Sequence, residues 1–180
     1  VFVVGFTHIW ALMFTNIYRN QLTRVQATHW VWENIPGDFS MVVENAPPET
    51  PLVNIALFNP FGEENQLTAQ ASVLDPGIEY VYDFTAPADG VIREVNIPHM
   101  SAMTLGSTEV HRLRVIIRSA DGSGRLSQGT LTGDFPRGDH PIGPGYTIAL
   151  EAPVPVTAGT DYTFEARIET AGQLILSGAV

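Results

Sequence analysis

The sequence predicts a mostly β fold, an antiparallel two-sheet β-sandwich preceded by an apolar N-terminal helix and a short amphipathic helix. Three observations predict it. From Leu52 onward, apolar and polar residues alternate in short segments, as they do in strands with one buried face. The 180 residues include 13 prolines and 16 glycines, which are the residues that make turns between short strands. No segment after Pro36 shows a helical period.

The first segment, Val1–Tyr18, contains no Asp, Glu, Lys or Arg. As a helix it would span roughly 27 Å, close to the ~30 Å hydrocarbon core of a bilayer. Tyr18 and Arg19 stand where an aromatic ring and a cation would meet lipid headgroups. We therefore expect residues 1–20 to form the end of a transmembrane helix and to make the membrane a partner. The alternative is a buried core helix or strand pair of a soluble protein.

Residues 21–46 are expected to connect this helix to the sandwich. Thr23–Trp32 is predicted to be a short amphipathic helix, because Thr23 and Gln26 have the spacing of a capping box. Asn34-Ile35-Pro36-Gly37 would end it. Phe39–Val43 is then predicted to be a strand, and it runs into the proline-rich stretch Glu44–Pro51.

Residues 47–180 are predicted to form the β-sandwich domain. Its strands alternate an apolar face with a polar one, as in HRLRVIIR, where the leucine, the valine and the second isoleucine would face the core while the arginines face solvent. Nine strands are expected in this domain: Val53–Phe58, Leu67–Val73, Ile78–Phe84, Val91–Ile97, His111–Arg118, Arg125–Leu131, Tyr146–Glu151, Asp161–Glu169 and Gln173–Ser177.

Composition and charge exclude several functions. The net charge is −10, with no lysine; two arginines and one glutamate precede Gly37, so the rest of the chain carries −11. Such an acidic surface repels phosphate backbones, so nucleic acid is not expected to be a partner. The chain has no cysteine, which removes disulfides, thiolate nucleophiles and cysteine-ligated zinc. We expect the chain to be a fragment or a processed product, because it starts at Val1 and ends on an apolar run.

No catalytic constellation is recognisable. None of the five histidines has a second histidine or a carboxylate at metal-ligand spacing on one helix, and the motifs HExxH, GxSxG, GxxxxGK[ST] and GxGxxG are absent from the sequence. Whether the chain is an enzyme stays open, and no cofactor is predicted, with Ca²⁺ considered for one loop, residues 133–145. A soluble glycoside-active enzyme would need a well-placed pair of carboxylates, and the spacing singles out none.

One loop is a candidate for ligand binding. Residues 133–145 include two carboxylates that suit sugar hydroxyls or Ca²⁺, and an aromatic ring that suits a pyranose face. The alternative is a solvated hairpin loop. The candidate binding residues are Asp134, Phe135, Asp139 and His140.

The connecting segment IYRNQLTRVQATHWVWENIP resembles the end of the transmembrane region in bacterial polytopic membrane proteins of the glycosyltransferase-39 type. In that family such a stretch follows the last helix and opens an extramembrane domain. The resemblance implies an extracytoplasmic C-terminal domain at the cell membrane, without the catalytic acid, which lies in an earlier loop of such transferases. The matching positions are Ile17, Tyr18, Thr23, Arg24, Val25, Ala27, Trp30, Glu33, Asn34, Ile35 and Pro36.

The β region separately resembles the jelly-roll or galactose-binding-like sandwiches that serve as carbohydrate-binding modules. The segments that carry this resemblance are YVYDFTAPADGVIREVNI and PVPVTAGTDYTFEARIE. Two functions from different classes follow. The first is a non-catalytic extracytoplasmic accessory domain of a membrane glycosyltransferase-like protein that binds glycan. The second is a membrane-anchored or secreted surface module, such as an adhesion or filament subunit, with no enzyme partner.

Overall fold

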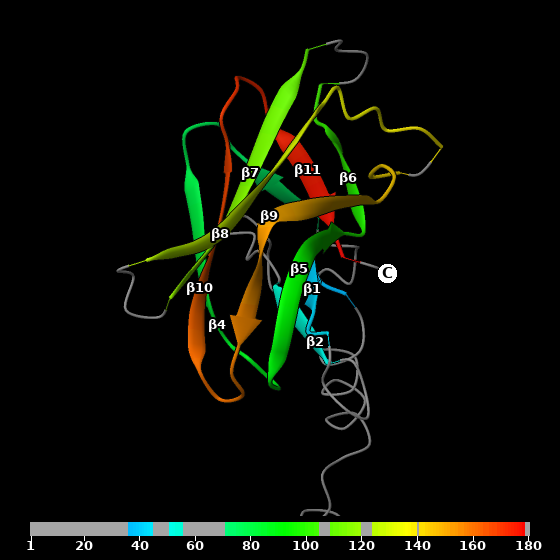
Figure 1. The fold of residues 1–180 in the computed structure, drawn as a ribbon. Helices are drawn as coiled ribbons and strands as arrows, with labels where there is room; N and C mark the ends of the chain where they lie inside the picture. The colour runs from blue at the N-terminus through cyan, green and yellow to red at the C-terminus, as the bar shows by residue number, and fades with distance from the viewer. Residues whose placement is uncertain are drawn as a thin grey trace, which may run out of the picture. The chain divides into compact units, whose positions relative to one another are not determined.

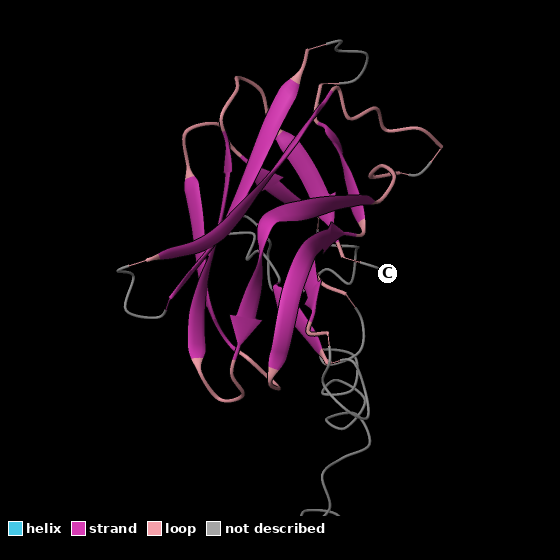
Figure 2. Cartoon of the chain, in the orientation of Figure 1, coloured by secondary structure: helices cyan, strands magenta, loops and turns pink. Residues whose placement is uncertain are grey.

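The computed structural model describes residues 36–44, 51–55, 71–104, 109–119, 124–139 and 141–178, which belong to one compact unit. The two helices predicted within residues 1–32 lie outside the described residues, as does most of the proline-rich stretch. In the described part of the chain, no helix is long and apolar enough to cross a membrane. Figure 2 shows that this part consists of strands and loops.

The described residues form eleven strands (Figure 1). In chain order they are β1 Phe39–Val42, β2 Leu52–Ile55, β3 Ser72–Leu74, β4 Glu79–Thr85, β5 Gly90–Ile97, β6 His99–Ala102, β7 His111–Ser119, β8 Arg125–Gly133, β9 Tyr146–Val156, β10 Asp161–Ile168 and β11 Leu174–Ser177. Each of the nine segments predicted as a strand within residues 47–180 overlaps one of them.

The strands form three antiparallel sheets in an open, sandwich-like arrangement. Their orders are β2-β1-β5-β9, β4-β10-β7-β8 and β3-β11-β6. The prediction of antiparallel sheets is confirmed, but the described residues form three sheets instead of two, because among these strands β3, β11 and β6 pair only with one another.

Alternation explains which face of each strand is buried. In β10, Tyr162, Phe164, Ala166 and Ile168 are buried, while the residues between them face outward. β7 follows the same rule, except that Ile116 is buried on the outer face, between Glu165 of β10 and Gln128 of β8. A period of two therefore places these strands correctly.

One contiguous apolar core joins the three sheets. The rings of Phe39 on β1 and Phe164 on β10 lie 5.1 Å apart and link two of the sheets directly. The largest fully buried side chains come from all three sheets: Phe39, Phe164, Met41, Ile55, Leu74, Ile92, Ile97, Met100, Leu113, Ile117, Ile148 and Leu174.

Strand β9 is longer than predicted and bends part-way along (Figure 1). The bend coincides with a register shift: Ile92 of β5 pairs with Val154, but Glu94 pairs with Ala149. The extra residues of β9 lie next to β8, where the backbone N–H of Ala152 donates to Ser127 Oγ at 3.1 Å. The bend thus brings β9 into contact with β8 of a second sheet.

Candidate functional site

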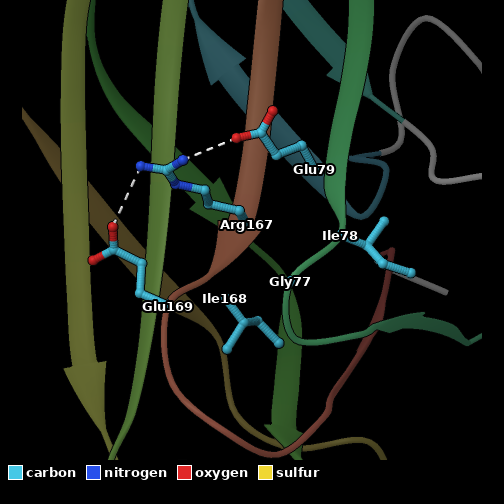
Figure 3. Close-up of a pocket in the computed structure, with 6 residues that line it drawn as sticks. All are labelled: Gly77, Ile78, Glu79, Arg167, Ile168 and Glu169. Carbon is cyan, nitrogen blue, oxygen red and sulfur yellow. Dashed lines mark hydrogen bonds and ion pairs between the residues drawn. The ribbon is translucent and has the colours of Figure 1, made fainter.

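A hollow of about 220 Å³ lies at one end of the β4-β10-β7-β8 sheet (Figure 3). Its walls come from the segment that enters β4 and from the segment that leaves β10. The lining residues are Gly77, Ile78, Glu79, Arg167, Ile168 and Glu169.

A tight turn forms one wall of the hollow. The N–H of Ile78 donates to the carbonyl of Asp75 at 3.4 Å, with Pro76 and Gly77 between them. Gly77 has φ +79°, so this turn has the pattern of type II, which favours proline at its second position and requires a positive φ at its third. A side chain at Gly77 would have space but would be strained by the backbone conformation.

Side chains from two other segments hold this turn in place. The hydroxyl of Tyr80 accepts from the N–H of Asp75 at 3.0 Å and donates to the carbonyl of Val73 at 3.1 Å. The side-chain amide of Gln173 donates to the Asp75 carboxylate. The wall that presents Ile78 is therefore tied to β3 and to the start of β11.

Strand register brings the charged residues of the hollow together. Arg167 of β10 is the cross-strand partner of Glu79 of β4, and the Arg167 Nη1 to Glu79 Oε1 distance is 2.9 Å. An isolated bridge between Pro76 and Ile168 closes the same end of the sheet. Opposite charges on directly paired positions stabilise the pairing.

Glu169, just after β10, is shared by three arginines. Its carboxylate lies 2.9 Å from Arg114, 3.5 Å from Arg167 and 3.9 Å from Arg112. Arg114 and Arg167 are themselves cross-strand partners, so Glu169 offsets the repulsion between two like charges. We call Glu79, Arg112, Arg114, Arg167 and Glu169 the arginine cluster.

The arginine cluster differs in charge from its surroundings. Its three arginines and two glutamates give a net charge of +1. The other described residues hold four arginines and twelve carboxylates, a net charge of −8. The Nε atoms of Arg114 and Arg167 are enclosed by protein and have no hydrogen-bond partner among the described residues.

The hollow offers three kinds of contact to a ligand. Glu79 and Glu169 present acceptor oxygens on either side of the Arg167 donors (Figure 3). Ile78 adds an apolar surface, since 48% of this residue is exposed. Acceptors, donors and an apolar patch at one place suit a polyhydroxylated ligand.

In the loop predicted to bind a ligand, the aromatic residue Phe135 packs into the core. Phe135 is only 2% exposed, and its ring contacts Tyr146 edge-on at 5.2 Å and stacks on His111 at 6.4 Å. Its carbonyl accepts from the N–H of Ala102 at 2.8 Å, and its φ is +44°. Because the ring belongs to the core, Phe135 does not present a stacking face to a sugar in this structure.

The carboxylates of that loop are accessible. Asp134 and Asp139 are exposed, and His140 lies outside the described residues. Burial, and secondarily the nearby charge of Asp134, raises the pKa of the Tyr146 hydroxyl. In the part of the chain that the structure describes, no group of three or more His, Asp or Glu side chains could hold a metal ion. The binding roles of Asp134, Asp139 and His140 stay predictions.

Sequence reasoning did not find the hollow. Glu79 and Arg167 lie 88 residues apart, and only the pairing of β4 with β10 makes them neighbours. The sequence contains two features of the hollow: the turn sequence Asp75-Pro76-Gly77, and the outward positions of Glu79 and Arg167 in their alternating strands. Neither feature says which strands pair.

No protein-family model matches the chain, and no curated protein matches it.

Proposed function

We propose that this domain is a non-catalytic glycan-binding accessory domain with a jelly-roll or galactose-binding-like sandwich, and that its parent is a membrane glycosyltransferase-like protein. The observation that carries the proposal is the row of acceptor, donor and acceptor made by Glu79, Arg167 and Glu169 beside the exposed Ile78. Sugar hydroxyls both donate and accept hydrogen bonds, while the C–H face of the ring is apolar.

The size of the hollow suits a small part of a glycan. Pockets for drug-sized ligands measure about 300–1,000 Å³, and this hollow measures about 220 Å³. One sugar residue would enter it, with Arg167 as donor and the two glutamates as acceptors. The remainder of the glycan would extend over the sheet.

The membrane placement is supported by the sequence. Val1–Tyr18 has the length and apolar character of the end of a transmembrane helix, and the segment after it resembles the exit from the membrane region of glycosyltransferase-39 proteins. We propose on this basis that the domain lies at the cell membrane, on the extracytoplasmic side. There it would hold a glycan acceptor or product near the transferase.

A glycan array probed with the full chain tests the proposal. We expect saturable binding. Arg167→Gln should reduce the affinity by at least about tenfold, since hydrogen bonds to a charged group are among the strongest. Ile78→Ala should also reduce the affinity by at least about tenfold, because it removes the apolar surface beside Arg167. Arg118→Gln is the matched control for Arg167, because Arg118 is 32% exposed at its side chain against 36% and pairs with Glu165 on the same sheet. Leu126→Ala is the matched control for Ile78, since it is also exposed and apolar.

The outcomes separate the alternatives. Binding lost in Asp134→Ala but kept in Arg167→Gln would move the site to the loop of residues 133–145. Absence of binding to every glycan by a folded chain would overturn the proposal. It would favour the surface or structural module without an enzyme partner.

A further inference from the structure

We infer that the glycan bound at the hollow is acidic and that Arg112 binds its carboxylate. The inference rests on the proposed function, because it names the class of sugar for the same site. It is carried by the position of Arg112, by the arginines that surround the carboxylate of Glu169 and by the local excess of positive charge.

Arg112 lies next to Glu169, which lines the hollow, and its guanidinium donates no hydrogen bond to the residues that the structure describes. Its side chain is 53% exposed, and its nearest carboxylate oxygen, Glu169 Oε2, is 3.9 Å away, too far for a hydrogen bond. The backbone fixes this position, since the Arg112 carbonyl accepts from the N–H of Glu169 at 2.9 Å and its own N–H donates to Thr170 Oγ1 at 2.9 Å. A guanidinium can therefore reach a ligand that contacts the Glu169 wall.

Arginine donors surround the carboxylate of Glu169. One of its oxygens lies 2.9 Å from Arg114 and 3.5 Å from Arg167, and the other accepts from Arg114 at 3.2 Å. The cluster thus has more donors than acceptor oxygens, which agrees with the unpaired Nε atoms of Arg114 and Arg167. A carboxylate on the ligand would supply acceptors in the planar, forked geometry that arginine prefers.

The charge distribution favours an acidic ligand here over other surfaces. The arginine cluster carries +1, while the remaining described residues carry −8. The negative charge of the remaining described residues repels an acidic glycan. The electrostatic free energy of its approach is therefore lowest at the arginine cluster. The attraction acts between partly exposed charges, so it weakens as salt is added.

Calorimetric titration of the full chain tests the inference. The probes are oligosaccharides of galacturonic, glucuronic and mannuronic acid, each paired with its own methyl ester, which keeps the shape but removes the charge. We expect at least one acid to bind about fivefold more tightly than its ester, as for a partly exposed ion pair. Arg112→Gln should abolish this difference, and salt at about 0.15 M should reduce it.

Arg93→Gln is the matched control, because Arg93 has a 52% exposed side chain and pairs with Glu44 on another sheet. It should leave the preference for the acid intact. Acids and esters that bind equally well, or a preference for the acid that survives in Arg112→Gln, would overturn the inference while leaving the proposed function in place. No binding by acids, esters or neutral glycans would overturn both.

Discussion

His111 is a buried imidazole whose ring nitrogens are unpaired within the described part of the chain. It is 2% exposed, and neither Nδ1 nor Nε2 has a hydrogen-bond partner there. Its ring stacks on Phe135, and a Cβ at Gly172 would come within 2.5 Å of it. A buried polar group left unpaired costs about 1–3 kcal/mol of folding free energy. At this position packing, not hydrogen bonding, must hold the ring.

We predict that His111→Leu raises the free energy of unfolding by about 1 kcal/mol, because an apolar side chain of similar size removes the unpaired nitrogens. Urea unfolding would measure this change, provided that the dependence of the unfolding free energy on urea concentration is the same in the two proteins. His99→Leu is the control with the opposite sign, because His99 Nδ1 lies 3.0 Å from the carbonyl of Gly143 and that interaction would be lost. A lower stability for His111→Leu would contradict the prediction.

The titration of the Tyr146 phenol should make the stability of the fold depend on pH. Burial, and then the charge of Asp134, raises the pKa of its phenol above the ordinary value of about 10. The folded state therefore keeps the phenolic proton to higher pH than the unfolded state does. The stability linked to this proton is intact below about pH 10 and is lost as the pH rises through the higher folded-state value.

The tyrosinate absorbance that disappears in Tyr146→Phe reports this titration. We expect Asp134→Asn to lower the pKa of Tyr146 only part of the way toward its ordinary value, because burial is the larger cause. An equal pKa in the parent chain and in Asp134→Asn would show that Asp134 does not act on this phenol.

Among the elements, strands that alternate between a buried and an outward face could be predicted most closely from the sequence. β10 has one buried face, β7 departs from this pattern at Ile116, and the predicted ends of both strands agree with the structure within one residue. β6 was missed because three consecutive residues, Met100, Ser101 and Ala102, are buried and leave no period of two. β9 was predicted too short because its second half contains prolines, which usually argue against a strand.

Contact between β8 and β9 requires a glycine. A Cβ on Gly129 of β8 would lie 2.6 Å from Ile148 Cγ2 and 2.7 Å from the carbonyl oxygen of Ala149. We predict that Gly129→Ala lowers the free energy of unfolding by about 1–3 kcal/mol, as overpacking does. Gly124→Ala is the matched control, since no atom lies within 4 Å of its Cβ position, and it should have almost no effect. Equal midpoints of thermal unfolding for the two variants would contradict this packing.

At the level of the whole molecule, the order of the strands in the sheets could not be predicted from the sequence. The sequence indicated outward charges on β4 and β10. The hollow forms because these two strands pair and make neighbours of Glu79 and Arg167, which lie 88 residues apart in the chain. Conversely, Phe135 looked like a ligand contact because it lies in a polar loop, whereas its ring completes the core between His111 and Tyr146. Residue type and local pattern do not reveal which distant strand covers a side chain.

The strongest test of the assembled sheets is Phe164, which belongs to the core shared by all three. Its side chain is fully buried on β10, and its ring meets Phe39 of β1 at 5.1 Å. We predict that Phe164→Ala lowers the free energy of unfolding by about 3–5 kcal/mol, because it removes a large side chain and leaves a cavity. The same change at Tyr82, a half-buried ring on the edge strand β4, should cost less.

Denaturant unfolding monitored by both far-UV circular dichroism and tyrosine fluorescence would measure the two variants. If the three sheets unfold as one unit, the loss in Phe164→Ala shifts both signals together. A cost below about 1 kcal/mol for Phe164→Ala would contradict its central place in the core. Two separate transitions would mean that one sheet is stable without the ring contact between Phe39 and Phe164.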